Sequence, residues 1–322
     1  MTDTSRRAFW LLAAALFALY IIWGSTYFAI RIGVESFPPL MLAGIRYLCG
    51  GVLLFSFLLL RGHALPTGKQ WLAAAVIGVL LLAVGNGLVT VAEHMQVPSG
   101  IAAVMVATVP LFTLCFSRLW GITHSRVEWS GVAIGLVGIV LLNTGHNLAG
   151  NPWGAGLILI ASLSWAFGSV WSARLPLPTG AMAGAAEMLI AGAVLLLTSQ
   201  LHGEQLTGTP STQSLLALGY LILFGSVIAV SAYMYLLKNV RPALATSYAY
   251  VNPMVAVLIG IGLGGERLTA VEWLALAVIL AAVLLVTLGK LLFRPATPRR
   301  KAEAVPVASG RKGSIILLLT KG

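Results

Sequence analysis

Charged side chains are scarce in this sequence. Asp, Glu, Lys and Arg make up 9% of its 322 residues, hydrophobic residues make up 59%, and the mean hydropathy is +0.95. Soluble domains carry about 25% charged residues. The shortage excludes an ordinary soluble chain and indicates a protein whose solvent is largely a lipid bilayer.

Cysteine is nearly absent too, because Cys49 and Cys115 are the only two and both lie in apolar segments. Neither has a neighbouring His or second Cys, so we predict no disulfide framework and no metal site. The His-Glu-x-x-His, Gly-x-Ser-x-Gly and Walker patterns are missing as well. We therefore expect no catalytic residues, no cofactor and no enzyme, and no nucleotide site that could drive a pump.

Long apolar runs, in contrast, are abundant. A helix needs about 20 apolar residues to cross a bilayer core roughly 30 Å thick. Interior Gly and Ala favour packed helices over barrel strands. We predict an all-α membrane protein with ten transmembrane helices. Their expected bounds are Phe9–Gly33, Pro39–Leu60, Gln70–Ala92, Gly100–Trp120, Trp129–Asn143, Trp153–Ala173, Gly180–Leu201, Ser214–Leu237, Ala243–Gly264 and Val271–Leu292.

Basic residues outnumber acidic ones by 20 to 9, and their placement predicts an orientation. Ten helices put both termini on one side of the membrane. If that side is the cytoplasm, outer loops hold only Arg31 and Arg267, and inner loops hold Arg61, Lys69, Arg118, Arg126, Arg174, Lys238 and Arg241. The positive-inside rule then predicts cytoplasmic termini. The net charge of +11 reflects this topology and anionic lipid headgroups, so we expect no nucleic-acid partner.

The two halves of the chain resemble each other at an offset of about 141 to 144 residues. Val127-Glu128-Trp129 recurs as Val271-Glu272-Trp273, and Pro110 matches Pro253. Five helices per half is an odd number, so the second half enters the membrane from the opposite face. Inverted repeats of this kind are a recurring transporter design. The predicted organisation is a cytoplasmic N-terminus (1–8), two inverted five-helix repeats (9–145 and 152–292) and a basic, disordered cytoplasmic tail (293–322).

Several motifs resemble a known family. The second repeat, with Tyr248, Asn252-Pro253, Gly265-Glu266-Arg267-Leu268-Thr269 and Glu272-Trp273, is similar to that of the EamA-type drug/metabolite transporter superfamily. Trp23-Gly24-Ser25-Thr26, Ser99-Gly100 and Thr108-Val109-Pro110-Leu111 resemble the first repeat. Within the superfamily, the chain resembles the YddG-like amino-acid exporters. The resemblance implies ten helices in the cell inner membrane, cytoplasmic termini and export of small solutes; Gly121-Ile122-Thr123-His124-Ser125 departs from the family pattern.

Two ionisable residues lie deep in predicted helices, where a charge costs about 2.5 to 3.5 kcal/mol on insertion scales. Arg46 lies on the outer side of the second helix, and Glu187 lies at the matching depth on the inner side of the seventh. We expect them to line opposite ends of a solute pathway. Arg46 would bind a carboxylate, and Glu187 an ammonium group or a coupling proton. The alternative is neutralisation by a helix terminus, a hydroxyl group or snorkelling.

The remaining candidates are polar and aromatic residues at helical spacing. Asn86, Thr90 and His94 form a polar stripe with Glu93, although residues at the rim such as Glu93 and His94 also occur as ordinary interface groups. Flat rings suit an apolar solute with a small polar head, but packing or an interfacial belt would explain them too. The aromatic and neighbouring candidates are Trp23, Tyr27, Trp165, Tyr248 and Asn252. Pro110 and Pro253 are predicted hinges, with fixed kinks as the alternative.

These features together predict a secondary transporter that exports small metabolites, with neutral or aromatic amino acids as the expected class, by alternating access. Transport would follow a gradient or proceed as facilitated flux. The expected partners are a small solute and the lipid bilayer, and the expected state is a monomer. One alternative is an exporter of lipophilic cations, which Glu187 would attract and Arg46 would repel. Another is a non-transporting intramembrane enzyme or scaffold.

Overall fold

The computed structural model describes residues 3–239 and 248–292. Every regular element within those ranges is a helix. Three predictions fall outside them, wholly or in part: the start of the ninth helix at residues 243–247, the inner-loop Arg241 and the tail at 293–322.

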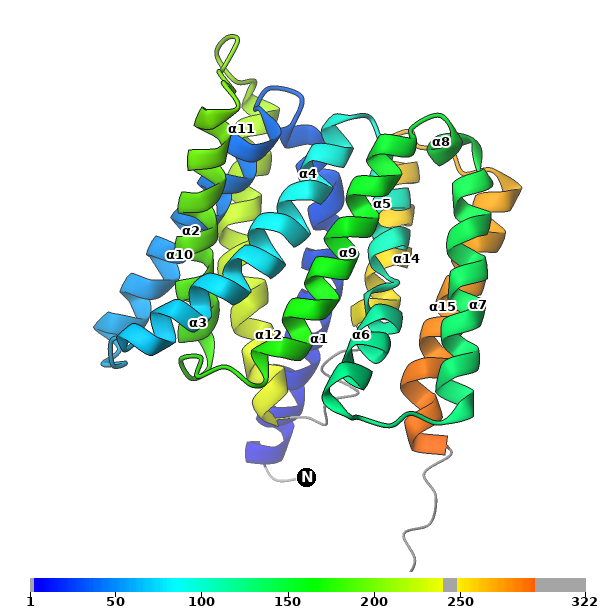
Figure 1. The fold of residues 1–322 in the computed structure, drawn as a ribbon. Coiled ribbons are helices and arrows are strands. Elements are labelled where there is room, and N and C mark those ends of the chain that lie inside the picture. Colours follow the sequence, from blue (N-terminus) through cyan, green and yellow to red (C-terminus); the bar gives the residue numbers. More distant parts are fainter. Residues whose placement is uncertain (1–2, 240–247, 293–322) are drawn as a thin grey trace, which may run out of the picture.

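Ten membrane-crossing segments run side by side (Figure 1), and the prediction of a ten-helix membrane protein is confirmed. Eight are long and apolar enough to span a bilayer, and the last two contain the shorter apolar helices Val251–Gly262 and Ala270–Val286. The first repeat comprises α1 (Asp3–Gly33), α2 (Pro39–Leu60), α3–η1–α4 (Gly68–Gly78, Val79–Asn86, Gly87–His94), α5–α6–η2 (Ser99–Val106, Val109–Ser117, Arg118–Trp120) and α7 (Arg126–Thr144). The second comprises α9 (Pro152–Ser172), α10 (Ala181–Leu201), α11–η3–α12 (Thr212–Tyr220, Leu221–Ile228, Ala229–Asn239), α14 (Tyr248–Gly262) and α15 (Ala270–Leu292), with the short α8 (His146–Ala149) between the repeats.

The helices pack as two related halves. Helix α2 packs on its counterpart α10, and α7 packs on its counterpart α15. The first helix of each half also lies against the fourth helix of the other half, as α1 on α14 and α9 on α5–α6. In Figure 1, the start of α1 and the end of α15 lie at the same lower face, which we call the N-terminal face. This reciprocal packing is the arrangement of an inverted five-plus-five repeat.

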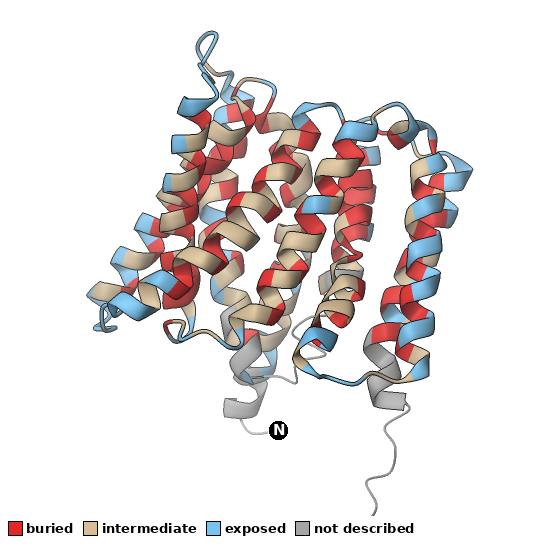
Figure 2. Cartoon of the chain, in the orientation of Figure 1, coloured by how far each residue is buried: buried red, intermediate tan, exposed pale blue. Residues whose placement is uncertain are grey.

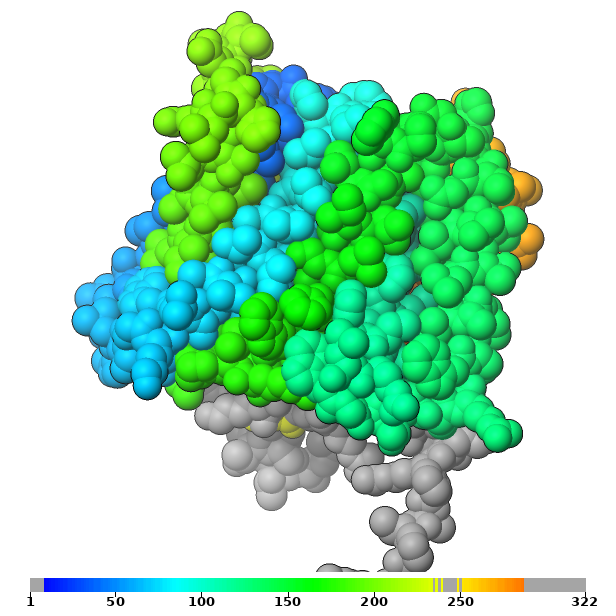
Figure 3. All heavy atoms as spheres, in the orientation of Figure 1, coloured from blue at the N-terminus to red at the C-terminus, as the bar shows by residue number. Residues whose placement is uncertain are grey.

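Glycine lets α2 and α10 approach each other closely. A Cβ atom added to Gly51 would lie 2.8 Å from the backbone nitrogen of Leu189, and one added to Gly192 would collide with the backbone of Leu48. Apolar side chains fill the rest of the interior, and Figure 2 shows buried residues concentrated along α5 in the centre. Figure 3 shows α3 and α9 packed side chain to side chain on one face. Small residues at helix crossings are the usual basis of such packing in membranes.

The repeated Val-Glu-Trp motif marks matching helix starts. Ser125 accepts from the backbone nitrogen of Glu128 at 3.2 Å, and the Glu128 carboxylate accepts from the Ser125 nitrogen at 2.7 Å. Thr269 and Glu272 form the same reciprocal pair at 3.3 and 2.8 Å. Both pairs are capping boxes, which satisfy amide groups that a helix start leaves without partners. In both repeats, the glutamate of the Val-Glu-Trp motif therefore has a structural role, because it caps the start of a helix.

A second symmetry was not predicted. The third crossing of each repeat contains eight residues of π-helix, η1 and η3. Segments of this kind widen the helix locally and are frequent at functional sites. Each one carries a small residue followed by a polar one, Gly85-Asn86 in η1 and Gly225-Ser226 in η3.

Candidate functional site

A cavity of about 990 Å³ lies between the two halves, lined by residues of both. Its lower rim includes Ile122, which is 43% exposed beside the N-terminal face. Its upper end is formed by Ile30, in the last turn of α1, and by Arg46, about two turns inside α2, and none of the described loops of the opposite face lines it. The cavity therefore opens toward the N-terminal face and is closed toward the other.

Arg46 bridges the two π-helical segments. Its Nε donates to the Ser226 hydroxyl at 3.3 Å and its Nη1 donates to the Asn86 amide oxygen at 3.2 Å. The guanidinium lies 4.8 Å from the ring centroid of Tyr47, and Arg46 is 4% exposed. Among residues 3–239 and 248–292 no carboxylate forms an ion pair with it. Neutral partners leave a full positive charge at the upper end of the cavity.

Glu187 lies in the same cavity, about two turns from the lower end of α10. Within the described ranges its carboxylate forms no ion pair. The backbone of α10 at Glu187 packs against Gly78, where an added Cβ would lie 2.6 Å from the Glu187 carbonyl oxygen. A carboxylate and a guanidinium from matching helices thus line one chamber. The sequence had suggested that they line opposite ends of a solute pathway, and in the cavity Arg46 lies at the upper end and Glu187 toward the lower end.

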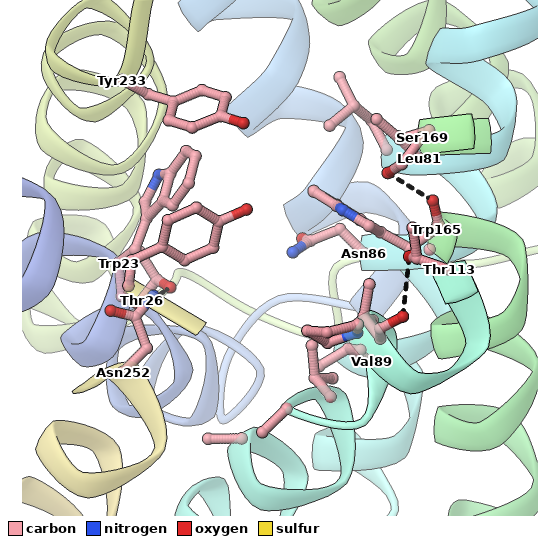
Figure 4. A pocket seen from close by; sticks show the side chains of 18 of the residues that line it. Trp23, Thr26, Leu81, Asn86, Val89, Thr113, Trp165, Ser169, Tyr233 and Asn252 are labelled. Carbon is pink, nitrogen blue, oxygen red and sulfur yellow. Dashed lines mark hydrogen bonds between the residues drawn. The ribbon is translucent and has the colours of Figure 1, made fainter. Parts of the chain in front are cut away.

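One wall of the cavity is aromatic (Figure 4). The ring of Trp23 lies 4.9 Å from that of Tyr248 and 5.5 Å from that of Tyr233, measured between centroids. The Trp23 indole donates to the carbonyl oxygen of Gly225 at 3.1 Å, which fixes its orientation. Across the cavity, Trp165 packs over Gly85, where an added Cβ would lie 2.9 Å from the ring. Rings therefore face each other from the two halves.

The two predicted hinges differ. Helix α5 ends at Val106 and α6 begins at Val109, so Pro110 stands in the first turn after a break in the fourth crossing. Pro253 instead lies inside the continuous helix α14. The preceding Asn252, with its amide oriented to donate, lies 3.3 Å from the carbonyl oxygens of Tyr20 and Tyr248. Pro at the start of a helix costs nothing, because the missing N–H has no partner there in any case.

The opposite face is closed by polar contacts between the halves. Arg31 donates to the Glu266 carboxylate at 2.7 Å. The same carboxylate accepts from the backbone nitrogen and hydroxyl of Ser99, at 2.7 and 2.6 Å, and from the Gly100 nitrogen at 3.0 Å. A negative charge at the start of α5 is favourable because it meets free amide groups and the positive end of the helix dipole. We call Arg31, Ser99, Gly100 and Glu266 the gate cluster.

At the open face, the described residue that matches Glu266 is not a carboxylate. Aligning Gly121 with Gly265 and Glu128 with Glu272 places Ile122 opposite Glu266. Ile122 cannot cap a helix or pair with a cation, and it lies at the mouth of the cavity. The departure from the family motif noted in the sequence therefore coincides with the open end of the molecule.

Comparison with known proteins identifies the family. The sequence profile of the EamA-like transporter family matches twice, at residues 8–144 and 152–288. The chain belongs to the EamA family. It is 70% identical over 287 residues, 89% of this chain and 94% of the relative, to the "Uncharacterized inner membrane transporter YedA" of Escherichia coli strain K12.

A more distant relative and a solved structure are also similar to this chain. The chain is 28% identical to "Protein PecM" of Dickeya dadantii, over 82% of this chain and 90% of that protein. A solved structure titled "Crystal structure of protein" is 21% identical and superposes with a TM-score of 0.60 over 86% of this chain and 97% of that chain, which shows a shared fold. The cavity between the repeats is thus a cavity within a membrane transporter.

Most of the residues selected from the sequence line this EamA cavity. They are Trp23, Tyr27, Arg46, Asn86, Pro110, Trp165, Glu187, Tyr248, Asn252 and Pro253. Thr90 and His94 do not line it. Thr90 is 1% exposed and its hydroxyl donates to the Asn86 carbonyl oxygen at 3.1 Å, so it packs within its own helix. His94 is exposed at the opposite face, with Nδ1 3.4 Å from the Val34 carbonyl oxygen. The stripe itself is regular, because α4 continues as an ordinary helix from Gly87 to His94, but the cavity does not extend along it to Thr90 and His94.

Several lining residues escaped the sequence analysis, among them Ser226, Tyr233 and His124. Ser226 contacts Arg46, and it could have been found because Gly225-Ser226 stands at the repeat position of Gly85-Asn86. Tyr233 has no aromatic counterpart in the first repeat, so nothing singled it out. His124 lies at the mouth, with Nε2 2.6 Å from the Ser117 hydroxyl and Nδ1 3.2 Å from the Glu128 carboxylate.

Proposed function

We propose that this EamA transporter exports small zwitterionic solutes, namely neutral or aromatic amino acids, across the cell inner membrane. The observation that carries the proposal is the pairing of charges in one cavity. Arg46 has only neutral partners and Glu187 lies in the same chamber without an ion pair among the described residues. A zwitterion supplies the carboxylate and the ammonium that these two groups lack, and a buried charge needs such a partner.

The aromatic walls favour the same solutes. Trp23 and Trp165 can contact an apolar or aromatic side chain, and an ammonium group over an indole face gains about 0.5 to 2 kcal/mol. A cavity of about 990 Å³ has room for such a solute and for additional water molecules. A lipophilic cation, the alternative solute, would meet Glu187 favourably but would be repelled by Arg46.

The positive-inside bias supports a cytoplasmic location for the N-terminal face and both termini. The cavity then opens to the cytoplasm, and the gate cluster closes it to the outside. Export begins when a solute enters this inward-open state. It continues when the gate cluster separates and the two repeats exchange conformations. The break before Pro110 and the missing backbone N–H of Pro253 inside α14 are where the fourth crossing of each repeat would bend.

The transport cycle needs one chain, because both repeats and the complete cavity lie within it. We therefore propose a monomer embedded in lipid. Because the sequence has no Walker motif, we propose that transport is driven by a gradient or proceeds as facilitated flux.

Flux in proteoliposomes tests the proposal. Vesicles containing purified protein are assayed with labelled phenylalanine, leucine and tetraphenylphosphonium. We expect amino-acid flux that falls at least tenfold in Arg46→Gln and Glu187→Gln, and no cation flux above that of empty vesicles. Arg61→Gln, which removes an exposed cation at the N-terminal face, is the matched control and should transport normally.

Two other outcomes would contradict the proposal. Cation flux that survives Arg46→Gln would favour the lipophilic-cation exporter. Absence of flux for every solute, together with no rise in melting temperature with any of the twenty amino acids, would favour the scaffold or enzyme. The thermal measurement is informative because a ligand at 100 times its Kd stabilises the folded state by about 2.7 kcal/mol.

A further inference from the structure

A second, smaller cavity of about 240 Å³ lies beside the gate cluster, and it shares no lining residue with the transport cavity. Its walls are polar and charged. They include Arg31 and Glu266 of the gate cluster together with Glu35, Glu93 and Arg267. We call it the gate pocket.

Glu93 is the unusual member of the gate pocket. It lies in the last turn of α4, is 2% exposed, and neither of its carboxylate oxygens has a hydrogen-bond partner among the described residues. Buried carboxylates are normally paired or bonded, as Glu266 is in the same pocket. The sequence alone does not distinguish Glu93 from an ordinary residue at the rim of a helix. Its burial in the structure does.

Two of the cations near Glu93 already have partners elsewhere, and Arg267 and Glu35, which also line the gate pocket, form no ion pair with it among the described residues. Arg31 from α1 pairs with Glu266, and Arg46 from α2 is bonded to Asn86 at the transport cavity. Glu266 adds a like charge, and the phenol of Tyr27 is the other titratable neighbour. Helices α5 and α9, which also pack on α4, carry no titratable side chain.

An ionised Glu93 would therefore be a buried charge without compensation. Removing an unpaired carboxylate from water costs several kcal/mol, so the group is neutral when the gate is closed. A bound metal ion would need more ligands, and among the described residues no group of three His, Cys, Asp or Glu is placed to hold one. A proton, in contrast to a metal ion, can be bound by a single carboxylate oxygen.

We propose that Glu93 is a proton-binding site whose occupation keeps the gate cluster closed. When the proton leaves for water, the carboxylate becomes negative and competes with Glu266 for Arg31. The ion pair weakens, the gate opens, and water reaches Glu93. The gating role rests on the proposed alternating access, whereas proton binding itself does not depend on which solute is carried.

Infrared spectroscopy of the detergent-purified protein tests proton binding without any transported solute. A protonated carboxyl group gives a C=O stretching band in the carboxylic-acid range, which an ionised carboxylate lacks. We expect this band in the wild type, its loss in Glu93→Gln, and its retention in Glu35→Gln, which changes an exposed carboxylate of the same pocket. Raising the pH should remove it. A missing wild-type band, or one unchanged in Glu93→Gln, would overturn the proposal, as would a band that responds to sodium and not to pH.

Thiol labelling tests the gate. In a background without Cys49 and Cys115, Val97→Cys places a thiol in the gate pocket, where Val97 is 1% exposed. Its maleimide labelling rate is divided by that of Leu206→Cys, a loop position that is 44% exposed, to remove the intrinsic pH dependence of the thiol. We expect the ratio to rise at least fivefold with pH in the wild-type background and to stay low with Glu93→Gln or Glu93→Met. Two neutral variants are used so that the test can still be carried out if one of them misfolds. A ratio that rises equally with neutral side chains would overturn the gating role while leaving the flux of the proposed function intact.

Discussion

Arg31 and Glu266 form an ion pair of 2.7 Å between the first helix and the loop that follows α14, but the two partners are not equivalent. The Arg31 side chain is 37% exposed, and that of Glu266 is 2% exposed. Glu266 also accepts three hydrogen bonds from Ser99 and Gly100 at the start of α5. The closed face is therefore held by a buried carboxylate, with the arginine as its outer partner.

This asymmetry predicts unequal effects of neutralising the pair. Arg31→Gln removes a half-exposed ion pair and should cost about 1 kcal/mol or less. Glu266→Gln weakens charge-assisted bonds to buried amides and should cost about 1.5 to 3 kcal/mol. Thermal unfolding in detergent measures both changes, and the labelling rate of Val97→Cys should rise more with Glu266→Gln. Equal effects of the two substitutions would show that the ion pair, and not the helix cap, closes the gate.

The fold was predictable because its two determinants, the apolar segments and the internal repeat, can be recognised directly in the sequence. Ten apolar runs predicted ten membrane crossings. The recurrence of Val-Glu-Trp and of a proline at matching positions predicted the repeat. The π-helical segments were not predictable, because stretches such as Val79–Asn86 fit a regular α-helix equally well. Their hydrogen-bond pattern depends on packing against the other half, which the local sequence does not record.

The capping boxes provide a test of structure alone. Ser125→Ala and Thr269→Ala each remove one side-chain cap, and each should lower the free energy of unfolding by about 1 kcal/mol. Solute flux should be unchanged, because neither residue lines the cavity. Thr67→Ala, at a third capping box, should cost the same. A loss of flux without a loss of stability in any of the three would show that the motif serves transport directly.

The candidate site was predictable only in part. Ionisable residues such as Arg46 and Glu187 stand out in apolar helices, and both line the cavity. Glu93 could not be separated from a rim residue, because burial depends on how α1 and α5 cover the end of α4. His94 is its sequence neighbour and points outward to the exposed surface. One residue along a helix turns the side chain by about 100°, so the exact rotation decides which of the two is buried.

Arg46 should depend on geometry as well as charge. Arg46→Lys keeps a cation but cannot reach Asn86 and Ser226 with separate nitrogens of a planar group. We expect Arg46→Gln to weaken amino-acid binding by about tenfold to a hundredfold, which corresponds to a charged hydrogen bond of about 1.5 to 3 kcal/mol. Arg46→Lys should fall between Arg46→Gln and the wild type. Concentration-dependent flux gives the apparent affinity, and full activity of Arg46→Gln would remove the carboxylate-binding role.

The aromatic wall should favour aromatic solutes. Trp23→Ala removes a ring that contacts Tyr233 and Tyr248, and it should weaken phenylalanine binding by roughly tenfold, close to 1.4 kcal/mol. The effect on alanine should be smaller, because a methyl group gains little from a ring. Trp23→Phe should retain most of the preference. Trp153→Ala, at a tryptophan that is 78% exposed, is the control. A uniform loss across all solutes would indicate that Trp23 only supports packing.

Close packing of the two repeats makes a final prediction about stability. A methyl group at Gly192 would collide with the backbone of Leu48, which cannot move without shifting α2. Gly192→Ala should therefore lower the free energy of unfolding by about 1 to 3 kcal/mol. Gly156→Ala is the matched control, because this glycine also lies inside a helix but nothing lies within 4 Å of an added Cβ. There the gain in helix propensity should stabilise the protein by up to about 1 kcal/mol. Thermal unfolding compares the two, and stabilisation by Gly192→Ala would show that α2 and α10 do not pack this closely in the membrane.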